Sequence, residues 1–273
     1  MAGRLTVCPT PIGNLGDISE RVRTALADAD VVACEDTRRT GLLYEKLGLD
    51  APRLMSNHEG NEDDRALQLA QAIERGARVA LISDAGTPAI SDPGYPLIRI
   101  CIERNLDIEV LPGPSAIVTA LVASGLPVAR WRFEGFLPRR AGELERLLQS
   151  MDTVVAFESP RRLPASLRAL AALAPDRPAA VCRELTKLHE EVLHGTAGEL
   201  SDRLTGGVRG EITLVVAPPE RGADAPDVAA AVGVLLAAGL TAAKAAEVAA
   251  ALGVAPRNAA YREALAAASR TAR

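Results

Sequence analysis

Short apolar runs alternate with amphipathic segments along most of the chain, a pattern typical of an α/β protein. The apolar runs suit buried strands, and the segments between them have apolar positions that recur with helical spacing. The strands expected are residues 5–8, 31–34, 53–55, 79–82, 108–111, 131–136, 153–157, 179–183 and 212–216. The helices expected are residues 18–27, 40–47, 65–74, 95–103, 117–123, 140–148 and 162–173.

The pattern changes from residue 223, where the sequence becomes rich in alanine and has no strand-like run. Helices are expected here at residues 227–238, 241–252 and 258–268, with Asp227 and Thr241 as N-caps. Another break lies near Ser124-Gly125-Leu126-Pro127. The sequence therefore predicts an N-terminal α/β domain (1–123), a C-terminal α/β domain (124–219) and a small helical appendage (224–273).

Residues 83–94 form a long polar loop directly after a strand-like run, with the sequence Ser-Asp-Ala-Gly-Thr-Pro-Ala-Ile-Ser-Asp-Pro-Gly. Pro93 fits the first helical position that follows, with Asp92 or Ser91 as its cap. Capping leaves four residues unexplained: Asp84, Ala85, Gly86 and Thr87. Ligands of open α/β sheets bind beyond the carboxyl ends of the strands, so this loop is predicted to face a ligand.

Two more loops with small residues follow predicted strands. Residues 10–17 contain Gly13, which permits close approach of the backbone to a ligand, although a plain connection is the alternative. Residues 112–116, Pro-Gly-Pro-Ser-Ala, end a strand and open a helix, where backbone amides are free to bind. Three such loops favour one shared pocket.

Glu35 and Asp36 end another predicted strand, in the run Glu-Asp-Thr-Arg-Arg. One interpretation is a solvated strand end in which Asp36 or Thr37 caps the next helix. The other is a carboxylate pair that positions or deprotonates a hydroxyl group.

Several other chemistries lack their signatures. Neither a Gly-x-Gly-x-x-Gly after a strand nor a Gly-Lys-Ser/Thr occurs, so no dinucleotide or P-loop site is predicted. His189 and His194 are five residues apart and share no helical face, so we expect no metal and an exposed strand or loop. The four cysteines form no Cys-x-x-Cys pair, and no signal pattern or long apolar run occurs, which indicates a cytoplasmic protein without a membrane partner.

The net charge of −4 argues against a uniformly basic coat for nucleic acid. Residues 130–190, however, hold 11 basic and 8 acidic residues, and arginine pairs follow two predicted strands at 139–140 and 161–162. Clustering at strand ends favours a polyanionic substrate, with ordinary surface charge as the alternative.

Together these motifs resemble the tetrapyrrole methylase superfamily, whose members bind S-adenosylmethionine between two α/β domains. The matching segments are residues 10–15, 35–38, 83–94, 112–116, 124–126, 135–138, 158–162, 184–187 and 210–211. The Ser-Asp-Ala-Gly-Thr-Pro loop and the Glu-Leu-Thr-Lys segment (184–187) resemble the branch that modifies RNA of the small ribosomal subunit. One departure is Ser56-Asn57-His58-Glu59, where the family often has His-Asn-Glu.

The resemblance implies a two-domain α/β fold with a cofactor cleft between the domains and a small C-terminal helical region. It implies S-adenosylmethionine-dependent 2′-O-methylation of a cytidine in the decoding region of 16S ribosomal RNA, by a homodimer. The implied cofactor residues are Pro11, Gly13, Asn14, Asp84, Ala85, Gly86, Thr87, Asp92, Pro112, Gly113, Ser115 and Ala116. The candidate catalytic residues are Glu35, Asp36, Glu184 and Lys187, and the candidate RNA-binding residues are Arg38, Arg139, Arg140, Arg161 and Arg162.

Two alternative functions stay open at this point. One is a methyltransferase acting on a tetrapyrrole or corrinoid, with the arginine pairs binding its carboxylates. The other is a cofactor-binding protein without catalytic activity. The sequence also leaves open which candidate is the general base, and whether naked RNA or the assembled subunit is the substrate.

Overall fold

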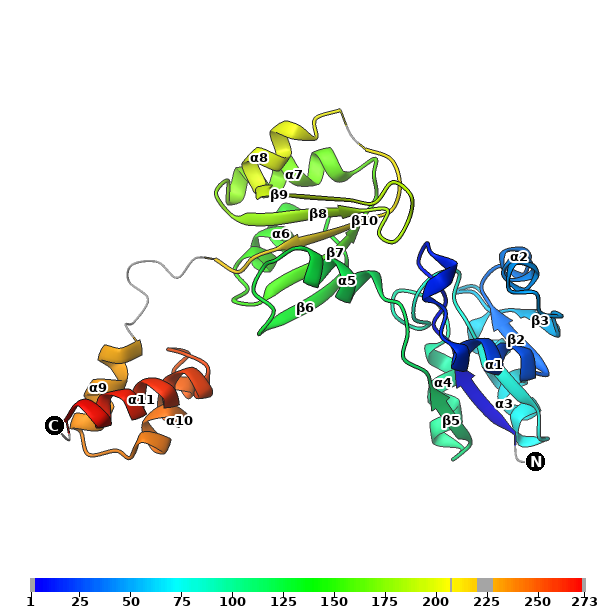
Figure 1. The fold of residues 1–273 in the computed structure, drawn as a ribbon, viewed down its shortest axis with the longest axis horizontal. Coiled ribbons are helices and arrows are strands. Elements are labelled where there is room, and N and C mark those ends of the chain that lie inside the picture. The colour runs from blue at the N-terminus through cyan, green and yellow to red at the C-terminus, as the bar shows by residue number, and fades with distance from the viewer. Residues whose placement is uncertain (1–2, 207, 220–227, 272–273) are drawn as a thin grey trace. The chain divides into compact units, whose positions relative to one another are not determined.

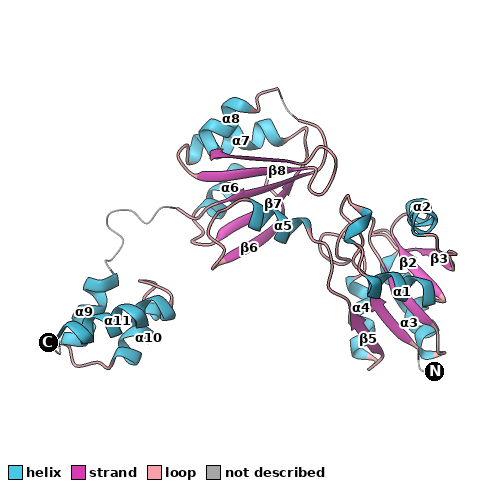
Figure 2. Ribbon diagram, viewed as in Figure 1, coloured by secondary structure: helices cyan, strands magenta, loops and turns pink. Residues whose placement is uncertain are grey.

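The computed structural model describes residues 3–206, 208–219 and 228–271, without the side chains after residue 267 (Figure 1). The chain divides into two compact units at the border between Pro219 and Glu220. The first unit contains two five-stranded sheets with their helices, and the second is helical (Figure 2).

The first sheet is parallel, with the strand order β3-β2-β4-β1-β5. Its strands are β1 (Arg4–Val7), β2 (Val31–Cys34), β3 (Arg53–Ser56), β4 (Arg78–Leu81) and β5 (Asp107–Val110). The helices that pack on it are α1 (Glu20–Asp28), α2 (Thr37–Leu47), α3 (Glu62–Glu74) and α4 (Tyr95–Glu103). Strand side chains alternate between faces, so Leu5 and Val7 pack in the core with α3 and α4, while Val32 packs with α1 and α2. Because the strands are parallel, all the predicted loops leave the same edge.

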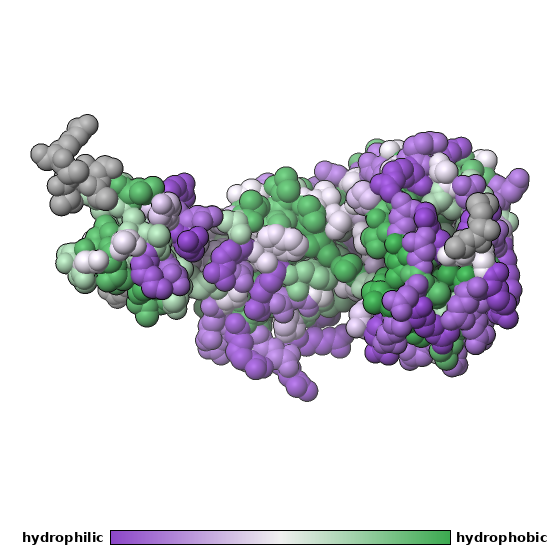
Figure 3. Space-filling view, turned by 90° about the horizontal axis from the view of Figure 1, so that it is seen from below, coloured by the Kyte–Doolittle hydropathy of each residue, from purple (hydrophilic) through white to green (hydrophobic). Residues whose placement is uncertain are grey.

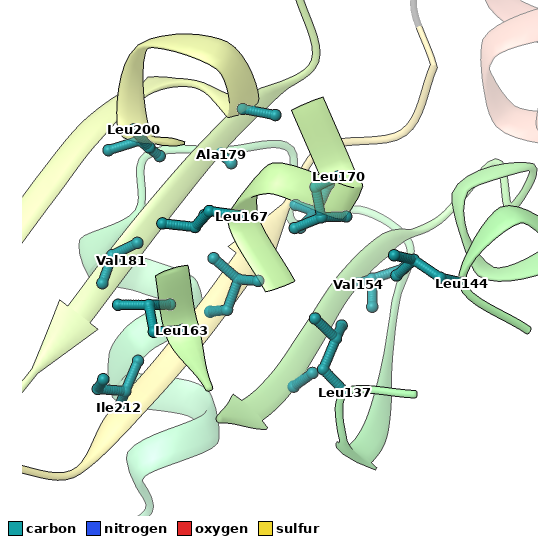
Figure 4. Close-up of a cluster of buried hydrophobic side chains, with 14 of the residues drawn as sticks. Leu137, Leu144, Val154, Leu163, Leu167, Leu170, Ala179, Val181, Leu200 and Ile212 are labelled. Atoms are coloured by element: carbon teal, nitrogen blue, oxygen red, sulfur yellow. The ribbon is translucent and has the colours of Figure 1, made fainter. Parts of the chain in front are cut away.

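The second sheet is mixed, with the order β6-β7-β10-β8-β9, and only its β6–β7 pair is parallel. Its strands are β6 (Trp131–Phe136), β7 (Thr153–Glu158), β8 (Pro178–Arg183), β9 (Glu191–Thr196) and β10 (Ile212–Val216). On one face, a leucine-rich core joins it to α6 (Ala141–Leu148), α7 (Leu163–Leu173) and α8 (Ala197–Arg203) (Figure 4). On the other face it packs against α5 (Ala116–Ala123) and Ile12.

The expected α/β class, with two sheets and C-terminal helices, is confirmed, and the expected strands all form, most with ends shifted by one residue. Helix α8 was not predicted from the sequence, although a capping box of Thr196 and Glu199 marks its start. The segment with the two histidines supplies β9, an edge strand. The sequence places α5 in the first domain, but the helix packs on the second sheet. The predicted domain boundary at residue 124 stays a prediction.

The predicted range of α4, residues 95–103, is confirmed, but the predicted cap is wrong. The helix begins at Tyr95 after Gly94, which has φ +130°, so Pro93 lies outside it and neither Asp92 nor Ser91 caps it. A Cβ at Gly94 would lie 2.8 Å from Leu81 Cδ2, and its backbone N–H donates to Glu62 Oε2 at 2.8 Å. Close packing against Leu81 of β4 therefore requires a glycine at this position. Gly94 is the N-cap of α4, in place of the Asp92 or Ser91 that the sequence indicated.

The second unit contains α9 (Val228–Ala237), α10 (Ala242–Ala251) and α11 (Arg257–Thr271), packed around a small alanine-rich core. Thr241 caps α10 by accepting a hydrogen bond from Lys244 N–H, whereas the expected cap Asp227 lies outside the described residues. Within the described part of the chain, no helix is both long and apolar enough to cross a membrane. Figure 3 shows hydrophobic patches among hydrophilic ones on the face in view.

Candidate functional site

A cavity of about 480 Å³ lies between the loops that follow strands of the first sheet and the strand ends of the second sheet. The chain up to residue 117 supplies Ile12, Glu35, Arg39, Asp84, Ala85, Gly86, Thr87, Ile90, Ser91, Asp92, Ser115, Ala116 and Ile117. The second-sheet side supplies Phe136, Phe157, Glu158, Ser159, Pro160, Cys182, Leu185, Gly210, Glu211, Ile212 and Thr213. Eight of the residues singled out in the sequence analysis therefore line one cavity: Glu35, Asp84, Ala85, Gly86, Thr87, Asp92, Ser115 and Ala116.

Hydrogen bonds join the three predicted loops. The backbones of Thr10 and Gly86 bond to each other in both directions, at 2.9 and 3.0 Å. The Thr10 hydroxyl donates to the Ser83 carbonyl at 3.1 Å, and the Thr87 hydroxyl donates to the Pro114 carbonyl at 3.3 Å. The loops thus form one continuous wall, as their positions after neighbouring strands predict.

Carboxylates dominate the charge of the cavity. Burial and the neighbouring Asp84 raise the pKa of Glu35, and burial together with Glu35 raises the pKa of Asp92 to about 6. Asp84 forms an ion pair with Arg39 at 2.7 Å and accepts a hydrogen bond from the Asp36 N–H at 3.3 Å. Arg39 was not among the residues predicted from the sequence, although it stands in the same run as Glu35 and Asp36.

The other catalytic candidates do not line the cavity. Asp36 caps α2, accepting a hydrogen bond from Arg38 N–H at 2.8 Å, as the first interpretation of its run predicts. Lys187 Nζ lies 2.9 Å from Glu184 Oε1 and 2.8 Å from Glu211 Oε2. Burial lowers the pKa of Lys187, but the hydrogen bonds to Glu211 and Glu184 outweigh burial and leave the pKa raised. Lys187 is therefore a cation at neutral pH, and the same pairing lowers the pKa of Glu184.

The five cofactor candidates outside the cavity lining are Pro11, Gly13, Asn14, Pro112 and Gly113. Gly13 faces protein: a Cβ there would lie 2.4 Å from Lys187 Cγ and 2.8 Å from Thr186 Oγ1. Gly113 packs against Pro9: a Cβ at Gly113 would lie 2.6 Å from Pro9 Cβ. Both glycines therefore let one backbone segment pack closely against another segment of the same protein. For Gly13, the sequence had instead indicated close approach of the backbone to a ligand.

Most residues that the second-sheet side contributes to the cavity lining were not predicted from the sequence. Phe136, Glu158 and Gly210 stand in segments that carry the family resemblance, but nothing in their spacing marks them as cavity residues. Only the order of the second sheet, with β10 between β7 and β8, brings them to one edge.

The arginine candidates fall into two groups. Arg38, Arg139, Arg140 and Arg161 are exposed, and only weak surface pairs hold Arg38 to Asp36 (3.3 Å) and Arg140 to Glu143 (3.5 Å). Arg162 instead forms an ion pair with the buried Glu158 and donates to the Leu137 carbonyl at 3.0 Å. Among the residues that the structure describes, no three His, Cys, Asp or Glu side chains group as a metal site.

Comparison with protein families matches residues 4–201 to the family described as Tetrapyrrole (Corrin/Porphyrin) Methylases. The chain is 48% identical over 245 residues to a protein of Mycobacterium bovis named ribosomal RNA small subunit methyltransferase I, covering 88% of this chain and 86% of the relative. A protein of the same name from Mesorhizobium japonicum is 44% identical over 268 residues, covering 96% and 91%.

Solved structures show the same fold at low sequence identity. Diphthine synthase matches with a TM-score of 0.60 at 16% identity, covering 78% of this chain and 90% of that one. Uroporphyrin-III C-methyltransferase from Thermus thermophilus, in a complex with S-adenosylhomocysteine, matches with a TM-score of 0.56 at 19% identity, covering 79% and 97%.

Proposed function

Because the chain belongs to the tetrapyrrole (corrin/porphyrin) methylase family, we propose that it methylates the ribose 2′-oxygen of a cytidine in the decoding region of 16S ribosomal RNA. The observation that carries this proposal is the similarity, over most of the chain, to proteins named ribosomal RNA small subunit methyltransferase I. S-adenosylmethionine is the proposed methyl donor.

The cavity fits this donor. Its lining includes the carboxylates Glu35, Asp84 and Asp92, which suit a ligand that carries a sulfonium and an ammonium charge. Ile12, Ile117 and Leu185 offer an apolar surface to an adenine ring. Backbone groups of Ala85 and Ala116 are the proposed hydrogen-bonding partners of the rest of the cofactor. When bound, the cofactor supplies an electrophilic methyl group, so the protein has to orient the attacking hydroxyl and accept its proton.

Glu35 is the proposed general base. It lines the cavity, and its raised pKa makes the carboxylate a stronger proton acceptor than an ordinary glutamate. Asp36 is engaged as a helix cap, and Lys187 has no free electron pair while it is protonated between two glutamates. Holding the hydroxyl in line contributes on the order of 7–11 kcal/mol in favourable cases, and the base adds about 10²–10⁴-fold.

Exposed arginines are the proposed contacts to RNA phosphates: Arg38, Arg139, Arg140 and Arg161. The assembled small subunit is the proposed substrate, in the cytoplasm. We also propose a homodimer, in keeping with the large exposed aliphatic side chains Val118 and Val122 on α5.

The decisive experiment is transfer of labelled methyl groups to undermethylated small ribosomal subunits, followed by nuclease digestion. Label in 2′-O-methylcytidine is the expected result. Label in an added tetrapyrrole instead would identify a small-molecule methyltransferase. Binding of S-adenosylmethionine with transfer to neither acceptor would identify a cofactor-binding protein.

A further inference from the structure

The three phenylalanines of the chain form one cluster. The Phe133 and Phe157 ring centroids are 5.0 Å apart, the Phe136 and Phe157 centroids are 6.0 Å apart, and both pairs meet edge to face. Phe133 and Phe157 are half-buried against the α5 core. The Phe136 side chain is different, because it is 58% exposed and lines the cavity.

A β-bulge places Phe136 there. The pairing of β6 with β7 shifts register between Phe133 and Phe136, and Gly135 has φ +66°. In a regular strand, residues three apart point to opposite faces, yet both rings contact Phe157. The extra residue of the bulge therefore turns the ring of Phe136 toward the cavity. The next residue, Leu137, points to the opposite face and is buried in the leucine-rich core (Figure 4).

The surroundings of Phe136 suit a flat apolar group that lies beside a polar reaction centre. Ile90, 46% exposed, and Pro160 also line the cavity. Ile90 stands between Ala89 and Ser91, which have φ of +68° and +63°, so the backbone there adopts a conformation that L residues rarely take. The carboxylates Glu35 and Asp92 line the same cavity. The cavity lining thus contains partly exposed apolar side chains as well as carboxylates.

We propose that the exposed ring of Phe136 stacks on the nucleobase of the nucleotide to be methylated, and so positions its ribose over the cavity. This proposal rests on the proposed function. A nucleotide that leaves the RNA stack can bring its ribose 2′-hydroxyl deep into a cavity, and an aromatic side chain replaces part of the stacking lost. Phe136 is a positioning residue in this scheme, because the base it holds is not the reacting group.

The test compares Phe136→Leu, which keeps apolar bulk but removes the ring, with Phe136→Tyr and Phe136→Trp, which keep a ring. KM and kcat are measured for methylation of small subunits, and the Kd for S-adenosylmethionine is measured by calorimetry. We expect Phe136→Leu to lower kcat/KM roughly 10- to 100-fold, in line with the value of one base–aromatic stack. The Kd for the cofactor should not change, and the Tyr and Trp variants should restore activity. Ile102→Ala is the control, since it trims another exposed apolar side chain, on α4.

Three results would overturn the proposal. If Phe136→Leu has the kcat/KM of the wild type, the ring does not stack on the substrate. If it weakens cofactor binding to the same extent, the ring belongs to the cofactor site. If the wild-type protein yields no 2′-O-methylcytidine, the proposed function itself fails, and the stacking proposal fails with it.

Discussion

Arg162 forms an ion pair with Glu158: its guanidinium Nη1 lies 3.4 Å from Oε1 of a carboxylate that has no exposed surface. The same carboxylate accepts hydrogen bonds from the Ser159 N–H, at 2.7 Å, and from the Ser166 hydroxyl. A second nitrogen of Arg162 donates to the Leu137 carbonyl. Arg162 therefore holds β7, the start of α7 and the end of β6 together, whereas its neighbour Arg161 is exposed.

This difference predicts opposite effects for two adjacent substitutions. Arg162→Ala leaves a buried carboxylate without its cation and should lower the free energy of unfolding by about 3 kcal/mol. Arg161→Ala should leave stability unchanged, weaken RNA binding and reduce the slope of its salt dependence by about 1. Thermal unfolding and RNA titration at several salt concentrations measure both. Equal loss of stability in the two variants would contradict the assignment.

Gly13→Ala should destabilise the protein. Its Cβ would lie 2.4 Å from Lys187 Cγ and 3.1 Å from the Leu185 carbonyl oxygen, so one of the two loops has to move, at a cost of about 1–3 kcal/mol. Gly41→Ala is the matched control, since that glycine lies inside α2 with no atom within 4 Å of the added Cβ. The control should gain about 0.5–1 kcal/mol. Denaturant unfolding of both variants would reveal whether the close approach matters.

Asp92→Asn should stabilise the protein at pH 7. The folded state raises the pKa of Asp92 to about 6 from an ordinary value near 3.8, so it holds the proton more tightly than the unfolded chain. Stability from this group therefore falls as the pH rises from about 4 to 6 and is lost above 6. The Asn variant lacks this dependence, so its gain in melting temperature should be larger at pH 7 than at pH 4. Asp50→Asn, at an exposed position, is the control.

Glu35→Gln should abolish the acid limb of the pH–rate profile. The wild-type rate should rise with pH through the raised pKa of Glu35, because only the carboxylate accepts a proton. The Gln variant should be slower by about 10²–10⁴-fold, with unchanged RNA affinity. Asp36→Asn serves as the control: asparagine also caps helices, so α2 should keep its cap and the rate should keep its acid limb. An acid limb that persists in Glu35→Gln would assign the proton transfer to another group.

Local signals were sufficient for most of the elements. The strands and helices follow from apolar spacing, and the caps at Asp36 and Thr241 follow from residue type, because both depend on neighbours close in the sequence. The cap of α4 was mispredicted because the residue at the N-cap, Gly94, is set by its contact with Leu81, thirteen positions earlier and on another element.

The sequence by itself determined that three loops with small residues follow apolar strands, and parallel pairing then brings such loops to one edge. Only the tertiary structure decided which of the charged candidates share the cavity. Glu35 lines the cavity and Asp36 does not, although the two are adjacent in the chain. In the same way, Arg162 pairs with the buried Glu158, whereas its neighbour Arg161 is exposed. The physical reason is that burial and ion pairing depend on partners from distant segments, such as Leu137 for Arg162 and Asp84 for Arg39. The same holds for the bulge that turns Phe136 toward the cavity, which is defined only by the pairing of β6 with β7.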